Sequence, residues 1–238
     1  MTTFIKTDDP VASAAKTAIQ AGDVEALKAL LATQPDLPKA HIGDQLEART
    51  LLHILTDWPG KTPNGPVIAI TLISAGADVD APFIGKHAET ALHWAASNGD
   101  VAMLDVLLDS GAEINAKGGV IAETPLANAR AFLEFETAHR LIERGANVTL
   151  HDAATMGLLP RVERACLLMK PSDRSVEINN AFWNACHGGQ LVVAKFLYEQ
   201  GADINAMPSW EELSPLRAAR RSGADHVVVW LEAQGANG

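Results

Sequence analysis

A short tag, Gly-Ala followed by an acidic or amide residue, recurs along this chain and constrains its fold more than any other feature. Its glycines are Gly76, Gly111, Gly145, Gly201 and Gly235, and the successive spacings are 35, 34, 56 and 34 residues. An apolar residue lies 19 positions before four of these glycines, at Leu92, Leu126, Phe182 and Leu216. A period this regular predicts an array of similar units that bury one continuous core between neighbours.

Each unit is predicted to contain two short helices. Residues with N-cap propensity precede the first helix, at Thr50, Thr90, Thr124, Asn180 and Ser214. The first helix then ends at a glycine, at Gly22, Gly99, Gly157, Gly189 or Gly223. The second helix carries apolar residues at helical spacing, such as Val101, Leu104 and Leu107, and ends at the tag glycine. Helices this short are not stable alone, so they must stack on neighbouring units.

Two segments carry a specific resemblance. "TALHWAASNGDVAMLDVLLDSGAEINA" (90–116) and "SPLRAARRSGADHVVVWLEAQGAN" (214–237) resemble ankyrin repeats, and weaker copies begin near Ser13, Thr50, Thr124, Thr149 and Asn180. The resemblance covers almost the whole chain as about seven repeats. It implies an all-α solenoid of helix–turn–helix units with short β-hairpin or loop connections. It also implies that His53 and His93 are framework histidines that bond backbone groups between repeats, a role that cannot be carried over to Trp183.

We expect a single ankyrin-repeat domain over 1–238, with an N-terminal cap at about 9–45 and a C-terminal cap at about 214–238. The segment from about 147 to 178 is irregular, because it nearly lacks a hairpin and its repeat ends without the tag. This irregularity either bends the stack or marks a boundary between halves, and we expect one continuous solenoid. In repeat four, Leu133 occupies the position of the glycine stop.

Repeat two contains an insertion, "TDWPGKTPNGP" (56–66), because 24 positions separate Leu52 from Gly76 where other copies have 19. Its Gly60-Lys61-Thr62 is not a phosphate-binding loop, since Leu55 stands where such a loop needs glycine. The prolines and glycines predict an ordered turn between the two helices of the repeat. We expect this turn to lie opposite or lateral to the hairpins, with Trp58 packed under the neighbouring repeat.

Charge and composition exclude several function classes. The 19 Lys and Arg residues against 29 Asp and Glu residues give a net charge of −10 without a basic run, so nucleic-acid binding is not expected. No apolar run is long enough for a membrane span, and the first residues do not resemble a secretory signal. Cys166 and Cys186 cannot form a disulfide framework, so we expect a cytoplasmic protein.

No residue is assigned to catalysis, to a metal or to a cofactor. His87, Glu89 and His93 form H-x-E-x-x-x-H, but the framework role that the resemblance implies for His93 leaves too few ligands for a metal. An alternative function remains open. In this alternative, a small-molecule binder or unusual enzyme has its pocket between the insertion and the 81–89 loop, at Asp57, Trp58, His87 and Glu89.

The favoured function is a protein–protein interaction module that binds an unidentified macromolecular partner, most simply a protein, through the concave groove and the hairpin tips. The tips at 81–89, 116–123 and 206–213 contain large apolar residues that a helical core does not need, namely Phe83, Ile84, Val120, Ile121, Met207 and Trp210. The alternative is that these side chains fold back on neighbouring loops. The candidate partner-binding residues are Phe83, Ile84, His87, Trp94, Asn98, Trp183, His187 and Trp210. For Trp94 and Trp183 we expect groove packing rather than a ligand cage.

We expect a monomer that does not bind membranes. Homo-association through the C-terminal cap stays open, because Val229 occupies the position of Asp105 in the clearest copy. The alternative that we expect is that Val229 and Trp230 fold against the first helix of their own repeat.

Overall fold

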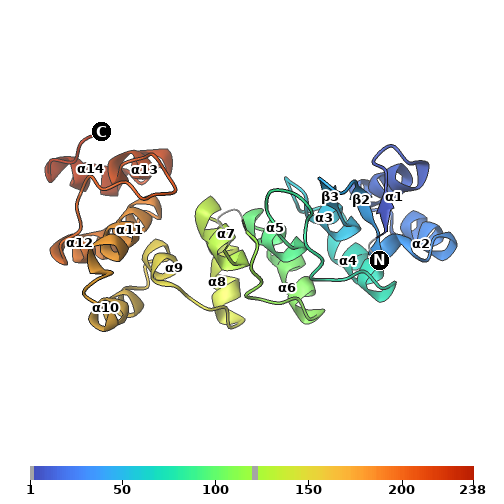
Figure 1. The fold of residues 1–238 in the computed structure, drawn as a ribbon, viewed down its shortest axis with the longest axis horizontal. Helices are drawn as coiled ribbons and strands as arrows, with labels where there is room; N and C mark the ends of the chain where they lie inside the picture. Colours follow the sequence, from blue (N-terminus) through green and yellow to red (C-terminus); the bar gives the residue numbers. More distant parts are fainter. Residues whose placement is uncertain (1–2, 120–122) are drawn as a thin grey trace. The chain divides into compact units, whose positions relative to one another are not determined.

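The computed structural model describes residues 3–119 and 123–238, and within them fourteen α-helices form seven successive pairs (Figure 1). The predicted all-α repeat architecture and the number of repeats are therefore confirmed. The chain divides into two compact units, Met1–Asn147 and Val148–Gly238. This division falls at the beginning of the segment predicted to be irregular. A single continuous domain over 1–238 remains a prediction.

Four helix pairs make up the first unit. They are α1 (Pro10–Ala21) with α2 (Val24–Thr33), α3 (Leu51–Thr56) with α4 (Gly65–Ser74), α5 (Ala91–Ser97) with α6 (Val101–Asp109), and α7 (Pro125–Phe132) with α8 (Phe135–Glu143). First helices pack against first helices, in the order α1, α3, α5 and α7, and second helices pack in the same way. Because the first helices of this unit pack side by side, the loops at their ends lie next to loops of the neighbouring repeats.

Residues predicted as N-caps begin most of the first helices. The Thr50 hydroxyl accepts a hydrogen bond from the His53 amide at the beginning of α3, and Thr124 does the same for the Ala127 amide in α7. Each satisfies an amide that the helix itself leaves unpaired, which contributes about 1 kcal/mol. The predicted glycine stops adopt the left-handed conformation, and Leu133 adopts it as well, with φ of 59°.

The core contains the apolar residues that the 19-residue spacing identified. Leu92, Leu126, Phe182 and Leu216 are all buried. In the first unit they are joined by further buried residues of both helix layers, among them Leu27, Leu52, Ile68, Leu104, Leu107 and Leu141. Burial of one such side chain contributes roughly 1.5–3 kcal/mol, so the packing of neighbouring repeats stabilises helices that are individually too short.

A hydrogen bond links the tag of three copies to the preceding repeat. The Glu113 amide donates to Asp80 Oδ1 (2.9 Å), and the Asn147 amide donates to Asn115 Oδ1 (2.8 Å). In the second unit the Asn237 amide donates to Asn205 in the same way, whereas the Asp203 amide donates to Asn179 within its own repeat. The periodic tag thus marks a repeated connection between neighbours.

A small sheet at the N-terminus was not predicted. Strand β1 (Phe4–Ile5) pairs in parallel with β2 (His41–Gly43), which pairs antiparallel with β3 (Ala48–Arg49). A 3₁₀ turn, η1 (Leu37–Lys39), precedes β2. Ala48 and Ile84 exchange both backbone hydrogen bonds at 2.9 Å, so the 81–89 loop is attached to the edge of this sheet. Strands of two or three residues leave too short a pattern to recognise in the sequence.

Three helix pairs make up the second unit. They are α9 (Leu150–Thr155) with α10 (Leu159–Leu168), α11 (Arg174–His187) with α12 (Leu191–Glu199), and α13 (Pro215–Arg221) with α14 (Asp225–Ala233). The prediction that Asn180 caps a first helix was wrong, because α11 begins at Arg174 and Asn180 lies within it. No glycine or proline lies between Arg174 and Asn180, and burial of Ile178 holds the extra turns against the core.

The prediction that Val229 and Trp230 of the C-terminal helix fold against the first helix of their own repeat was wrong. Val229 does not fold against its own repeat, since 67% of it is exposed. The Trp230 ring packs against rings of the preceding repeat, with centroids 6.3 Å from Phe182 and 5.7 Å from Tyr198. The first helix of the last repeat is short and carries small residues inward, so it offers α14 no large apolar face at this point.

Candidate functional site

The insertion is held by both neighbouring repeats. As predicted, it lies between the two helices of repeat two, α3 and α4. The Asn64 amide side chain donates to the Gly22 carbonyl (2.9 Å) in repeat one. The Lys61 backbone amide donates to Asp100 (3.0 Å) in repeat three. The insertion is therefore an ordered turn whose conformation depends on its neighbours.

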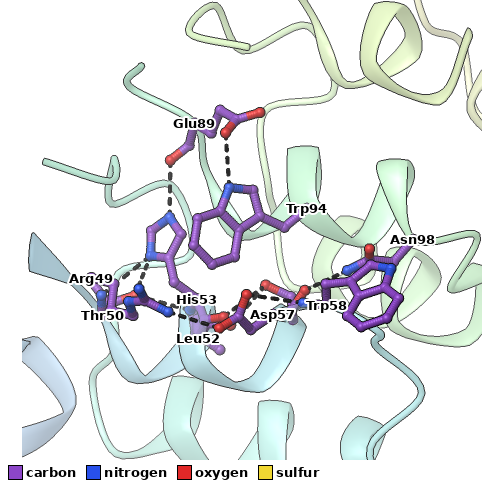
Figure 2. Close-up of polar contacts among 10 residues, drawn as sticks. Arg49, Thr50, Leu52, His53, Asp57, Trp58, Glu89, Trp94 and Asn98 are labelled. Carbon is purple, nitrogen blue, oxygen red and sulfur yellow. Dashed lines mark hydrogen bonds and ion pairs between the residues drawn. The ribbon is translucent and has the colours of Figure 1, made fainter. Parts of the chain in front are cut away.

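The position of the insertion differs from the prediction. Asp57 and Trp58 line the same cleft as Glu89, which lies at the base of the 81–89 loop, so the insertion is not opposite or lateral to that loop. Asn98 Nδ2 donates to the Thr56 carbonyl (2.8 Å) at the end of α3 (Figure 2). This bond holds the beginning of the insertion next to α5. The length of the insertion alone does not predict this position.

Trp58 is not packed under the neighbouring repeat, because 81% of it is exposed. Its backbone amide donates to Asp57 Oδ1 (2.9 Å) in a tight turn, and a cis peptide bond connects it to Pro59. The Lys61 backbone amide and the Asn64 side chain supply the contacts to the two neighbours, and the large aromatic side chain of Trp58 does not. The indole consequently lies at the surface.

The cleft has a volume of about 360 Å³ and belongs entirely to the first unit. Its lining residues come from the insertion, the base of the 81–89 loop, α5 and the end of α7. They are Asp57, Trp58, Glu89, Trp94, Ser97, Asn98, Phe132 and Glu134. Sequence reasoning identified Asp57, Trp58, Glu89, Trp94 and Asn98 but did not single out Phe132 or Glu134. The repeat register contained a signal for Phe132, which precedes Leu133 just as Asn98 precedes Gly99.

Trp94 forms a fixed part of the cleft wall. Its Nε1–H donates to Glu89 Oε2 (3.1 Å), as Figure 2 shows. Its ring lies edge-on to His53, with centroids 4.9 Å apart, and 5.7 Å from the ring of Phe83. Phe83 is half-buried and thus folds back on the groove. A ring with a polar anchor and two ring neighbours has few alternative positions.

A guanidinium group already lies against Trp94. The Arg49 Cζ atom is 5.8 Å from the ring centroid, within the range of a cation–π interaction. Arg49 Nη1 also pairs with Asp57 Oδ2 at 2.7 Å (Figure 2). Arg49 thus compensates the charge of Asp57 at one side of the cleft.

Two carboxylates of the cleft have no such compensation. Glu89 accepts hydrogen bonds from Trp94 and from Asn128 Nδ2 (2.6 Å), which are both neutral donors. The Glu134 carboxylate lies against Gly99, where a β-carbon would collide with it. Across residues 3–119 and 123–238, neither carboxylate has a Lys, Arg or His nitrogen within 4.0 Å. The cleft therefore carries a negative charge beside exposed aromatic rings.

The framework histidines hold the 81–89 loop in place. Thr50 N–H donates to His53 Nδ1, so Nε2 carries the proton and donates to the Glu89 carbonyl (2.9 Å). His93 makes the equivalent bond to the Glu123 carbonyl (3.1 Å). Burial lowers the pKa of His53 to about 4 and also lowers the pKa of His93, which keeps both rings neutral. The role implied by the resemblance is therefore observed.

The expectation that this role cannot be carried over to Trp183 was wrong, because the indole N–H takes it in the second unit. Its Nε1–H donates to the Leu213 carbonyl (2.8 Å), and only 4% of the residue is exposed. His187 is buried and stacks on Trp183, with ring centroids 5.2 Å apart. Little of either side chain reaches the surface, so their assignment to partner binding stays a prediction that burial does not favour.

The remaining candidates are spread over several places. His87 does not line the cleft that holds Asp57, Trp58 and Glu89, so three of the four alternative pocket residues meet and the fourth does not. Ile84 is half-buried at its bridge with Ala48. Val120 and Ile121 lie outside the described residues. In the second unit Met207 and Trp210 are exposed, by 63% and 42%.

Neither a metal-binding cluster nor a membrane-spanning helix is present among the described residues. Residues 3–119 and 123–238 contain no group of three or more His, Cys, Asp or Glu side chains that could hold a metal ion. Over the same ranges, no helix has both the length and the apolar character needed to cross a bilayer.

A second hollow adjoins the cleft in the first unit. Its volume is about 240 Å³, and its lining includes Lys16, Ile42, Glu47, Arg49 and Ile54. It also includes Asp57, which lines the cleft as well. Both hollows are therefore lined by Asp57, which pairs with Arg49. Together they extend from α1 to the end of α7.

Comparison with known proteins yields a family model and several relatives. The model described as ankyrin repeats (3 copies) matches residues 13–118 and 68–152. Palmitoyltransferase akr1 of Neurospora crassa is 37% identical over 89 residues, which are 37% of this chain and 12% of that protein. Ankyrin repeat and KH domain-containing protein mask-1 of Caenorhabditis elegans is 29% identical over 162 residues, 62% of this chain and 6% of that protein. The chain thus spans only a small part of these curated relatives.

Among solved structures, the crystal structure of the human ASB11 ankyrin repeat domain resembles this chain with a TM-score of 0.48 and 27% sequence identity. The similarity covers 79% of this chain and 85% of that one.

Proposed function

We propose that this chain, which belongs to the ankyrin-repeat family, binds a segment of a partner protein in the cleft of its first unit. Ankyrin repeats are general protein-interaction modules. The observation that carries the proposal is the exposure of two aromatic side chains at this cleft, 81% for Trp58 and 57% for Phe132.

Exposed aromatic residues beside a cleft favour macromolecular recognition. Trp and Tyr are among the residues that dominate binding energy in interfaces, especially where they enter a pocket from which water is excluded. A core built from Leu92, Leu126 and their neighbours does not need Trp58 or Phe132, which remain largely in solvent. A partner that covers both rings gains apolar burial that the isolated chain leaves unused.

The cleft is preorganised, and this supports the proposal further. Trp94 is anchored by Glu89, and Asn98 is anchored by the Thr56 carbonyl. Side chains that are already ordered lose little conformational entropy when a partner binds. The adjoining hollow at Arg49 provides room for a segment several residues long.

The predicted hairpin tips contribute differently in the two units. Phe83 and Ile84 are half-buried and are not exposed anchors. Phe83 packs against the Trp94 ring, and Ile84 is held by its bridge with Ala48. Met207 and Trp210 of the second unit are exposed and form a separate candidate surface. The proposed partner-binding residues are therefore Trp58, Trp94, Asn98 and Phe132, with Met207 and Trp210 as a second group.

The enzyme alternative is not proposed. Asp57 is paired with Arg49, and Glu89 is held by Trp94 and Asn128. His87, the only candidate base of that alternative, lies outside the cleft lining.

Quantitative capture from a lysate of the source cells tests the proposal. Wild-type chain is compared with a Trp58→Ala/Phe132→Ala variant and with a Leu167→Ala/Val192→Ala control, whose altered residues are similarly exposed but belong to the second unit. We expect at least one protein to be recovered by wild type and control and to fall roughly tenfold with the cleft variant. Equal recovery of every protein by all three would contradict the proposal. Circular dichroism confirms that each variant is folded.

A further inference from the structure

We propose that the cleft recognises a cationic side chain, an arginine or lysine, in a basic segment of the partner protein. This inference rests on the proposed function and adds the chemistry of the occupant. It is carried by the charge of the cleft, by its exposed aromatic rings and by two arrangements of arginine, tryptophan and a carboxylate within the same chain.

The charge of the cleft favours a cation. Asp57 is compensated by Arg49, whereas Glu89 and Glu134 face the cleft without a cationic partner among the residues that the structure describes. A bound ammonium or guanidinium group would pair with these carboxylates, while an acidic segment would be repelled by them. The net charge of −10 adds a long-range attraction for basic partners.

The aromatic rings favour the same occupant. Trp58, Trp94 and Phe132 line the cleft together with the two carboxylates. A cation within about 6 Å of a ring centroid is attracted by the electrons of the ring face, and Trp is the strongest partner. The aliphatic part of an arginine or lysine side chain can at the same time cover exposed apolar surface. One side chain therefore uses both properties of the cleft.

The chain itself uses this combination twice. Arg49 lies 5.8 Å from the Trp94 ring centroid and pairs with Asp57 at 2.7 Å. In the second unit, Arg221 lies 5.9 Å from the Trp183 ring centroid and pairs with Glu211 at 2.7 Å. In both cases a guanidinium group lies between an indole and a carboxylate. The cleft can hold a third guanidinium or ammonium group, supplied by the partner. The rings would be those of Trp58 and Phe132, and the carboxylates those of Glu89 and Glu134.

A random-peptide phage library panned on the full chain tests the inference without knowledge of the natural partner. The chain is used as wild type, as Trp58→Ala, as Glu134→Gln and as Glu136→Gln. Glu136→Gln is the matched control. Glu136 is exposed and lies two residues after Glu134, so this substitution removes the same charge outside the cleft lining. Enriched peptides are then synthesised, and their dissociation constants are measured by fluorescence polarisation at low and high salt.

We expect the enriched peptides to share an arginine or lysine, with arginine preferred because its planar group both stacks on rings and pairs with carboxylates. Binding should weaken roughly tenfold with Glu134→Gln, with Trp58→Ala, and when the shared cation of the peptide is replaced by glutamine. Glu136→Gln should leave it within about twofold, and binding should weaken at high salt.

The outcomes separate this inference from the proposed function. Enriched peptides without a shared cation that still require Trp58 would overturn the inference and leave the cleft as the binding site. Basic peptides that bind all variants equally would overturn both. If no peptide is enriched, the recognition of a short basic segment is wrong, and the lysate comparison decides the proposed function by itself.

Discussion

Trp94 and Trp183 lie one position apart in the repeat register, one in each unit of the molecule. Trp183 occupies the framework position itself, where it is buried and donates to the Leu213 carbonyl. Trp94 follows the framework residue His93 and forms part of a cleft wall, where it donates to Glu89. Each ring also lies near an arginine that pairs with a carboxylate.

The difference between the two tryptophans shows that a shift of one position decides whether the ring bonds to the next repeat or lines the cleft of the first unit. At the framework position the side chain must reach a backbone carbonyl of the next repeat, and either imidazole or indole N–H can do so. One position later, Trp94 lines a cleft to which the insertion of repeat two contributes Asp57 and Trp58. The second unit has no insertion at the equivalent turn of α11 and α12.

The largest effect is expected for Trp183→Ala, which tests whether Trp183 is a framework residue. It removes a buried ring and leaves the Leu213 carbonyl without its donor, so we expect a loss of about 3–5 kcal/mol of unfolding free energy. Urea denaturation followed by circular dichroism measures this loss. Trp183→His should recover part of it, because imidazole can bond to the same carbonyl. A loss below about 1 kcal/mol would mean that the register argument is wrong.

The framework histidine His53 should make the unfolding free energy depend on pH. The pKa of His53 is lowered to about 4 in the folded chain, against about 6.5 in the unfolded chain. The unfolded chain therefore binds more protons between these values, and stability falls as the pH decreases from about 6.5 to about 4. The full contribution of His53 is about 3 kcal/mol, since each pH unit is worth at most about 1.4 kcal/mol.

Urea denaturation of the wild type and of His53→Gln at several pH values measures this dependence. We expect a shallower slope for the variant within the same window, with the remaining slope due in part to His93, whose pKa is also lowered. Identical slopes would show that folding does not lower the pKa of His53.

The two arginines beside the tryptophans should contribute little to stability in either unit. Their ion pairs are partly exposed, with side-chain accessibilities of 35% and 49% for Arg49–Asp57 and of 46% and 29% for Arg221–Glu211. Such pairs typically contribute about 0.2–1 kcal/mol. Arg49→Gln and Arg221→Gln should therefore give similar small losses in thermal denaturation, which become smaller at high salt. A much larger loss for one variant would break the parallel between the two sites.

The smallest effect on stability is expected for Trp58→Ala. The side chain is largely exposed, so the unfolding free energy should change by less than about 0.5 kcal/mol. Its effect on partner recovery should nevertheless be large, whereas the main effect of Trp183→Ala is the loss of stability. A substantial loss of stability would show that the Trp58 ring packs on the chain in solution.

The local and periodic features of this protein could be predicted from its sequence. Threonine caps, glycine stops and apolar residues at fixed spacing act within a few residues of themselves, so their structural consequences repeat wherever the pattern repeats. The framework role of His53 followed from a motif four residues long, and its bond to the next repeat is present. Where the pattern was interrupted, as in α11, local reasoning misplaced the beginning of a helix.

The sequence by itself therefore determined the helix pairs, their core and the connections between repeats. Only the tertiary structure decided the cleft, because its lining residues lie as far apart as Asp57 and Glu134 and come from three repeats. They meet because hydrogen bonds of the insertion reach Gly22 and Asp100, and because Asn98 holds the end of α3. Such contacts have no period, so a repeat pattern could predict neither the exposed Trp58 nor the position of Glu134.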